Sequence, residues 1–208
     1  MSRIIMEEHN KASAWFNDLY ETHKDNHENI PWARQAVNPL LESYLEDETQ
    51  THKGKALVIG CGLGDDAHAL EVAGYDVLAI DVSEVALELA QKRSVGSSIK
   101  YEKQDIFDMP DEYKAHFDFV FEALTIQSLP IEFREKMINA ISETLAPKAK
   151  LLVVAHKRKR EVSGPPWPLT QEEIDLFKVA EGLKELSMEM HSENSMVSPE
   201  KFRALYEK

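Results

Sequence analysis

The sequence predicts an α/β fold built on a doubly wound, mainly parallel sheet with crossover helices. From residue 56 onward, short aliphatic and β-branched runs alternate with helical stretches, which is the pattern of parallel strands joined by helices. A glycine-rich loop over residues 60–64 separates the first apolar run from the first of these helices. The length of 208 residues, with 43% hydrophobic content, suffices for one sizeable core. We therefore expect a single domain over residues 1–208, with a helical lid at 1–50 and an α/β core at 54–208.

The segment before the sheet, residues 12–46, is predicted to be helical. Asn38 and Pro39 favour a helix start, because asparagine caps free N–H groups and proline is tolerated in the first turn. Apolar and aromatic side chains recur at helical spacing on two faces, namely Trp15, Phe16, Leu19 and Tyr20 on one and Leu40, Leu41, Tyr44 and Leu45 on the other.

Five short apolar runs are expected to form strands, and two runs near the C-terminus are further candidates. β-branched and aliphatic residues dominate these runs, and turn-forming residues bound them. The five strands are Ala56–Ile59, Asp76–Ile80, Ile99–Glu102, Phe117–Phe121 and Leu151–Ala155, and the candidates are Leu183–Met190 and Lys201–Tyr206.

Helices are expected between and after these strands, and their ends carry recognisable signals. Gly74 suits a left-handed C-cap, and Ser83 suits an N-cap. Thr170 and Glu173 form a capping-box pattern that predicts a helix after Thr170. The remaining predicted helices are about Asp66–Ala73, about Glu84–Lys92 and about Ile131–Leu145, the last with Phe133, Met137, Ile138, Ile141 and Leu145 on one apolar face.

The glycine loop contains Gly60, Gly62 and Gly64, so the backbone can turn tightly and approach a ligand. The dinucleotide fingerprint needs its third glycine one position later, where this chain has Asp65 followed by Asp66. Two carboxylates at a helix N-terminus satisfy its free amides themselves and repel a pyrophosphate. A cationic ligand is favoured instead, and S-adenosylmethionine carries both an ammonium and a sulfonium.

Two further aspartates follow the second and third predicted strands. Asp81 stands 21 residues after Gly60, where an acidic side chain can accept hydrogen bonds from both ribose hydroxyls. The alternative is that Asp81 only caps the next turn together with Ser83. Asp105 would lie beside the adenine and accept from its exocyclic amine, or would be an ordinary loop residue. The order and spacing of these features favour a nucleoside site.

At this point the chain shows a family resemblance. Residues 56–156 resemble class I S-adenosylmethionine-dependent methyltransferases, and "GCGLGDD…GYDVLAIDVSEVALELA" is similar to the thiopurine methyltransferase-like branch. That branch also tends to have a Pro-Trp pair after an aromatic N-terminal helix and a Gly-Pro-Pro-aromatic loop after the fifth strand. Here these are "IPWAR" at 30–34 and "GPPWPLT" at 164–170.

The resemblance implies a Rossmann-like, seven-stranded sheet of the class I methyltransferase type, in which the two C-terminal strands complete the sheet and the last is antiparallel. It also implies S-adenosylmethionine as the cofactor. The expected cofactor-binding residues are Gly60, Cys61, Gly62, Gly64, Asp66, Asp81, Val82, Asp105, Ile106 and Glu122.

The chain departs from the family pattern at three places. Val58 stands where most class I enzymes have an acidic residue, although the thiopurine-like branch lacks it too and has an acid at the position of Asp66. Pro147-Lys148-Ala149 replaces the usual Pro-Gly-Gly, which affects only the predicted turn. Glu122 is followed by Ala123 and Leu124 rather than by Arg and Gly, so the acceptor pocket does not transfer from the family.

The predicted function is methyl transfer to a small-molecule acceptor. Trp32 and Trp167 each lie in a proline-stiffened segment and are candidates for the acceptor pocket, or else they anchor loops. A thiol or other soft anion needs no general base, because a sulfonium is already a good leaving group. For a hydroxyl or amine acceptor, Glu122 and His156 are the candidate bases. Glu122, Thr125, Gln127 and His156 lie at predicted strand ends that face the cleft, or are ordinary loop residues.

Charge and composition restrict the partners. A formal net charge of −13 disfavours nucleic acid, and no run has the ~18 apolar residues of a membrane span. The single cysteine, Cys61, fits a reducing compartment, so we expect a cytoplasmic monomer or weak dimer. The basic run Lys157–Arg160 either attracts an anionic acceptor or is a solvated loop. His23 and His27 are spaced like metal ligands, but no further ligands accompany them, and no metal is expected.

Two other functions remain open from the sequence. The first is an NAD(P)-dependent oxidoreductase, which the displaced glycine and the Asp65-Asp66 pair disfavour. The second is a cofactor-binding protein without turnover.

Overall fold

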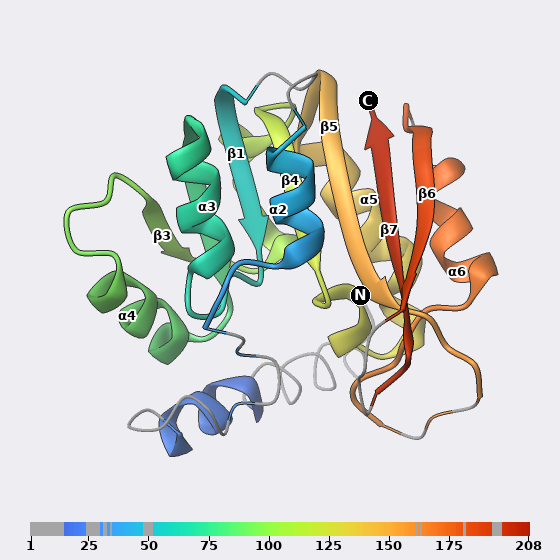
Figure 1. Cartoon of the computed structure of the whole chain (residues 1–208), viewed down its shortest axis with the longest axis horizontal. Helices are drawn as coiled ribbons and strands as arrows, with labels where there is room; N and C mark the ends of the chain where they lie inside the picture. Colours follow the sequence, from blue (N-terminus) through green and yellow to red (C-terminus); the bar gives the residue numbers. More distant parts are fainter. Residues whose placement is uncertain are drawn as a thin grey trace. The chain divides into compact units, whose positions relative to one another are not determined.

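The computed structural model describes residues 15–23, 30, 33, 35–47, 52–160, 162, 164–180, 182–192 and 197–208 (Figure 1). Its chain divides into two compact units. Unit 1 contains the described residues of Met1–Lys53 together with Gly60–Asp105, and unit 2 contains Gly54–Ile59 and the described residues of Ile106–Lys208. The strands of the described chain form a seven-stranded sheet in the order β3-β2-β1-β4-β5-β7-β6.

Unit 1 pairs strands β2 and β3 in parallel, with Asp81 at the end of β2 opposite Lys103. Helix α3 packs on β2, α4 packs on both strands, and α2 packs on α3. Residues 15–22 are also helical. The bounds are α2 Pro39–Leu45, α3 Asp65–Ala73, β2 Tyr75–Asp81, α4 Glu84–Arg93 and β3 Lys100–Lys103.

The helix ends of unit 1 confirm most of the predicted caps. The Asn38 side chain accepts the N–H of Leu40 at the start of α2, and the Ser83 side chain accepts the N–H of Ala86 at the start of α4. Gly74 closes α3 in the left-handed region with φ 110°.

Unit 2 contains the remaining strands, of which β1, β4 and β5 are parallel. β7 lies between β5 and β6 and is antiparallel to both, as predicted for the last strand (Figure 1). The strand bounds are β1 Gly54–Ile59, β4 Phe117–Ala123, β5 Leu145–His156, β6 Lys184–Ser192 and β7 Glu200–Glu207. The helices are α5 Arg134–Thr144 and α6 Gln171–Asp175, with 3-10 turns η2 Ile106–Asp108, η3 Asp111–Tyr113, η4 Ile126–Ser128, η5 Ile131–Phe133 and η6 Leu176–Lys178.

The core of unit 2 is formed by its central strands. Leu151–Ala155 in β5 are all fully buried, because a parallel strand with neighbours on both sides is covered on both faces. Phe117, Phe119 and Phe121 of β4 are buried as well. At about 25 cal/mol per Å² of apolar area, such side chains provide most of the stabilisation that holds the strand ends in place.

The prediction of one helix over Ile131–Leu145 is wrong at both ends. Residues 131–133 form the 3-10 turn η5 after Pro130, and the α-helix begins only at Arg134. Leu145 is extended, with φ −74° and ψ 126°, and is the first residue of β5. Lys148, which replaces a glycine of the family pattern, takes up φ 68° inside this strand.

The described helices include none with the length and apolar character that a bilayer crossing requires.

Candidate active site

The glycine loop of unit 1 turns through three glycines with positive φ, which are Gly60 at 65°, Gly62 at 53° and Gly64 at 83°. The Cys61 N–H donates to the Ile80 carbonyl at 3.0 Å, which ties the loop to β2. A Cβ at Gly64 would lie 2.6 Å from the Tyr101 hydroxyl, so this position requires glycine for space as well as for φ.

Asp81 is the polar centre of this loop. Its side chain is buried at the end of β2, where Oδ2 accepts the Gly62 N–H and Oδ1 accepts the Ser83 N–H, both at 2.9 Å. Burial raises the pKa of Asp81, and the N–H groups of Ser83, Gly62 and Val82 oppose that shift. A carboxylate oxygen can accept two hydrogen bonds, so each has room for one more donor beside its backbone partner. Asp81 therefore caps the next turn through the Ser83 N–H, and its oxygens can also accept hydrogen bonds from two hydroxyl groups.

The two aspartates at the start of α3 differ from the prediction, because neither caps the helix. Gly64 is the N-cap, and it has no side chain that could bond to the first amides. Asp65 instead pairs with Arg93 through two bonds of 2.6 and 2.9 Å, and Asp66 Oδ1 accepts the Asn38 N–H at 2.7 Å. Asp65 thus has a cationic partner, and Asp66 ties the N-terminal segment to the loop.

The electrostatic environment of the loop is negative. The pKa of the Cys61 thiol is raised well above its ordinary value, first by burial and then by the charges of Asp81 and Asp66. Burial disfavours a charge of either sign, whereas the two carboxylates disfavour a phosphate and favour a cation. The loop therefore fits a nucleoside with a positively charged substituent, as S-adenosylmethionine has, better than a dinucleotide.

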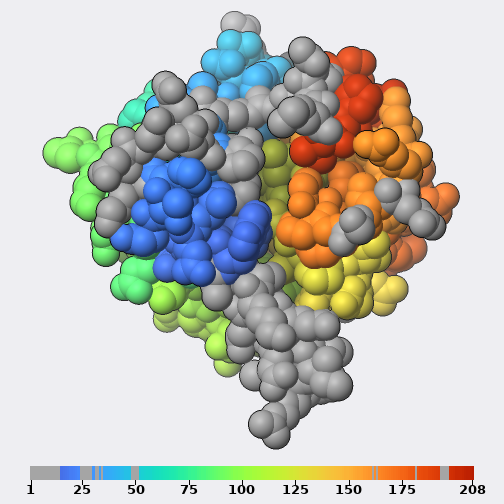
Figure 2. Space-filling view, turned by 90° about the horizontal axis from the view of Figure 1, so that it is seen from below, coloured from blue at the N-terminus to red at the C-terminus, as the bar shows by residue number. Residues whose placement is uncertain are grey.

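The N-terminal helical residues pack against the glycine loop within unit 1. The Ser83 hydroxyl donates to Asn17 Oδ1 at 3.0 Å. Tyr20 and Ile30 form a buried cluster with Leu63 and Ala86. Figure 2 shows residues 15–23 in blue at the surface of this unit. Within unit 1, the N-terminal helical residues therefore contact the loop and the start of α4.

Asp105 lies at the end of unit 1, and its carbonyl accepts Gln104 Nε2 at 3.2 Å. The Gln104 N–H donates to the Asp81 carbonyl at 3.1 Å, so the segment after β3 is fastened beside the end of β2. Val82 is half-buried next to Asp81, whereas Ile106 begins η2 and belongs to unit 2.

Glu122 is the penultimate residue of β4 in unit 2 and is fully buried. Its Oε1 accepts the N–H groups of Thr125 and Ile126, each at 2.8 Å, and thereby caps the turn η4. Its Oε2 is buried without a hydrogen-bond partner in the described structure. Burial raises the pKa of Glu122 to about 7, against the opposing effect of the two N–H groups and of Arg134.

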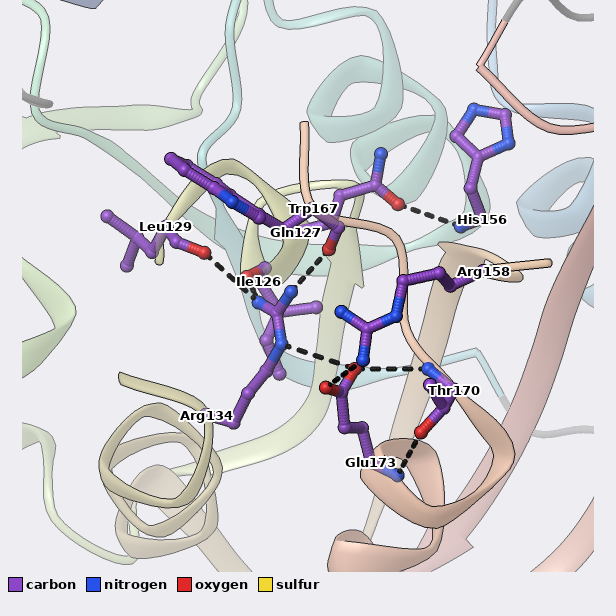
Figure 3. A network of polar contacts seen from close by, with 9 residues as sticks. All are labelled: Ile126, Gln127, Leu129, Arg134, His156, Arg158, Trp167, Thr170 and Glu173. Atoms are coloured by element: carbon purple, nitrogen blue, oxygen red, sulfur yellow. Dashed lines mark hydrogen bonds and ion pairs between the residues drawn. The ribbon is translucent and has the colours of Figure 1, made fainter. Parts of the chain in front are cut away.

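A polar network in unit 2 joins the segments that follow β4 and β5 (Figure 3). The Trp167 N–H donates to the Gln127 carbonyl at 2.6 Å, and the His156 N–H donates to Gln127 Oε1 at 2.8 Å. Arg134 on α5 donates to the carbonyls of Ile126 and Trp167. In Figure 2 the orange segment after β5 lies beside yellow residues that follow β4.

Acidic side chains neutralise the basic run after β5. Arg158 pairs with Glu173 at 2.5 Å, and Lys157 and Lys159 reach Glu200 at 3.8 and 2.9 Å. Each of these three side chains therefore has an acidic partner.

Arg134 was not among the predicted site residues, although the sequence contains a signal for it. Arg134 precedes Met137 and Ile138 by three and four positions, which places it on the predicted apolar face. A guanidinium on such a face, 2% exposed here, needs buried partners. Trp32 and His27 lie outside the described residues, and the described part of the chain contains no cluster of metal-ligating side chains.

The seven-stranded sheet, the glycine loop and Asp81 at the end of β2 together define a class I S-adenosylmethionine-dependent methyltransferase. Two solved structures share this fold. The N-methyltransferase NodS of Bradyrhizobium japonicum with S-adenosylhomocysteine has a TM-score of 0.68 at 19% identity, over 91% of this chain and 97% of that one. Magnesium protoporphyrin IX methyltransferase of Synechocystis with bound cofactor has a TM-score of 0.72 at 17%, over 95% and 97%.

Within that class, the chain belongs to the thiopurine S-methyltransferase family, whose profile matches residues 20–204. Thiocyanate methyltransferase 1 of Arabidopsis thaliana is 31% identical over 165 residues, which cover 76% of this chain and 70% of the plant protein. Thiopurine S-methyltransferase of Legionella pneumophila strain Corby is 26% identical over 183 residues, or 80% of each chain. The protein is therefore an enzyme that uses S-adenosylmethionine to methylate a small molecule, and the oxidoreductase alternative is not favoured.

Proposed function

We propose that the acceptor is a small, soft nucleophile, either a thiolate or a comparable sulfur anion. The observation that carries this proposal is the family membership, because relatives at 31% and 26% identity are named for thiocyanate and thiopurines. The chemistry is consistent with it, since a soft anion attacks a sulfonium methyl group without first losing a proton.

The cofactor-binding residues of this proposal lie chiefly in unit 1. Asp81 accepts the two ribose hydroxyls with the capacity left beside its two N–H partners. Asp105 accepts the adenine amine, and the loop from Gly60 to Gly64 lets the backbone approach the methionine part. Cys61, Asp66, Val82, Ile106 and Glu122 complete the proposed set. When bound, S-adenosylmethionine supplies an electrophilic methyl carbon whose leaving group is a neutral thioether.

Positioning accounts for most of the proposed catalysis. Holding a nucleophile in line with the methyl group contributes about 7–11 kcal/mol. Trp167, and Trp32 in the same role, would form an apolar wall that excludes water from the sulfonium. Glu122 and His156 serve as bases only for a hydroxyl or amine acceptor. Glu122 already holds two backbone N–H groups, which suits a role in shaping the η4 turn.

A screen with methyl-labelled cofactor tests the proposal. Thiocyanate, 6-mercaptopurine, thiophenol and hydrosulfide are compared with phenol and benzylamine, and Asp81→Ala serves as the variant without cofactor binding. The proposal requires label transfer to at least one sulfur acceptor and little or none to phenol or benzylamine. Exclusive methylation of oxygen or nitrogen would contradict it, and cofactor binding with no transfer would favour a binding protein without turnover.

The proposal also includes a cytoplasmic location, a monomer or weak dimer, and no nucleic-acid partner. The single cysteine supports a reducing compartment, and the net charge of −13 supports the absence of nucleic acid.

A further inference from the structure

Gln127 is a buried amide at the turn after β4 and is only 3% exposed. It lies in η4, directly after Ile126, whose N–H is held by Glu122. Two groups of Gln127 are used within unit 2. The backbone carbonyl accepts the Trp167 N–H at 2.6 Å, and the side-chain Oε1 accepts the His156 N–H at 2.8 Å.

The orientation of this amide is fixed by chemistry. A backbone N–H can bond only to the amide oxygen, so the oxygen must face His156 and the nitrogen must face the other way. Figure 3 shows Nε2 of Gln127 directed away from His156. Among the described residues, Nε2 donates to none. Nε2 is not fully buried, so a ligand or water can reach it and accept its protons.

The same turn is hydrogen-bonded to Trp167, the residue proposed for the acceptor pocket. The Trp167 backbone is fastened on both sides, because its N–H donates to Gln127 and its carbonyl accepts from Arg134. Figure 3 shows the indole extending away from the Arg134 guanidinium. The backbones of Gln127 and Trp167 are hydrogen-bonded to each other. Gln127 supplies the Nε2 donor and Trp167 supplies the aromatic ring.

We propose that Gln127 is a specificity-determining residue whose Nε2 donates a hydrogen bond to the bound methyl acceptor. The inference rests on the proposed function and names the kind of acceptor more closely. A donor without an accompanying acceptor selects a ligand with exposed lone pairs, and an anion is the stronger hydrogen-bond acceptor. The fitting ligand is a small anion with a soft nucleophilic atom and a second lone-pair atom, as thiocyanate has. An amine, which is protonated in water, is disfavoured.

The closing experiment separates the two functions of the Gln127 side chain. Gln127→Glu keeps an oxygen for the His156 N–H and replaces the donor with an acceptor, whereas Gln127→Met removes both. Gln171→Glu makes the same change at an exposed residue of α6 and serves as the matched control. With thiocyanate as the probe, Gln127→Glu is expected to raise KM at least tenfold and to leave cofactor affinity within about twofold. An unchanged KM for thiocyanate in folded Gln127→Glu would overturn the inference.

A second measurement does not depend on turnover, and it follows the signals of the wild-type protein. In ¹⁵N-labelled wild-type protein bound to S-adenosylhomocysteine, the Gln127 side-chain NH₂ signals are identified by their loss in Gln127→Met or Gln127→Glu. Thiocyanate should shift these signals, and should not shift those of Gln171. No shift at saturating thiocyanate would refute the assignment. If the signals shift but no sulfur acceptor is methylated, the proposed function fails while the Gln127 site stands.

Discussion

Glu122→Gln should gain stability relative to the wild type as the pH rises from 4 to 8. Glu122 is buried at the end of β4, where one carboxyl oxygen holds two N–H groups and the other lacks a partner in the described structure. An amide of the same shape keeps the oxygen that accepts both N–H groups. It removes the negative charge that burial disfavours.

The magnitude follows from the pKa of Glu122, which burial raises from 4.5 to about 7. The folded protein therefore holds this proton more tightly than the unfolded chain does. Its stability falls as pH rises between about 4.5 and 7, and the full cost is present above pH 7. A difference of this size corresponds to about 3 kcal/mol of unfolding free energy. Below pH 4.5 Glu122 is protonated in both states and the cost disappears.

Urea unfolding of both proteins at a series of pH values measures this difference. The free energy of unfolding of Glu122→Gln relative to the wild type should rise by about 3 kcal/mol between pH 4 and pH 8. The buried NH₂ group of the glutamine lowers this relative stability by the same amount at every pH. Glu112→Gln, at an exposed position in η3, is the matched control. A difference that does not change with pH would refute the assignment of a buried, destabilising charge to Glu122.

Three further changes test the site. Asp81→Asn should weaken cofactor binding, measured by calorimetry, at least tenfold because the hydrogen bonds to its charge are lost. The control Asp76→Asn, at an exposed position of β2, should leave the affinity unchanged. If Asp81→Asn binds the cofactor as tightly as the wild type does, Asp81 is not part of the cofactor site. Trp167→Ala should cut turnover or acceptor affinity with a modest change in Tm, and a large Tm loss with normal kinetics would make Trp167 only a loop anchor. Arg134→Lys should increase amide hydrogen exchange at residues 126–129 and at Trp167 and Leu169, since an ammonium cannot span two carbonyl groups as the guanidinium does. Unchanged exchange would show that Arg134 does not hold these segments together.

The sequence predicted the sheet and most helix ends because those features depend on local signals. The caps at Asn38, Ser83 and Thr170 each place a polar side chain one turn before an amide that needs a partner. The strands were found from their apolar runs, but their ends were set by neighbours. β5 extends back to Leu145 because Leu145 pairs with Phe117 of β4, and a single sequence does not reveal that pairing.

The site was only partly predictable for a related physical reason. Asp81 follows a strand at a fixed distance from the glycine loop, so its position is encoded locally. The partners of Asp65 and Asp66 are Arg93 and Asn38, which are distant in sequence, so the expected helix cap was wrong. The network around Arg134 likewise joins α5 to a segment 33 residues further along the chain.

The most direct test of the account is product analysis with methyl-deuterated S-adenosylmethionine and a sulfur anion. Purified protein is incubated with thiocyanate or 6-mercaptopurine, and mass spectrometry follows both the acceptor and S-adenosylhomocysteine. The account predicts a deuterated methyl group on sulfur and an equal amount of S-adenosylhomocysteine, with both lost in Asp81→Ala. Intact cofactor after incubation with every sulfur acceptor, in a protein that binds S-adenosylmethionine by calorimetry, would contradict it.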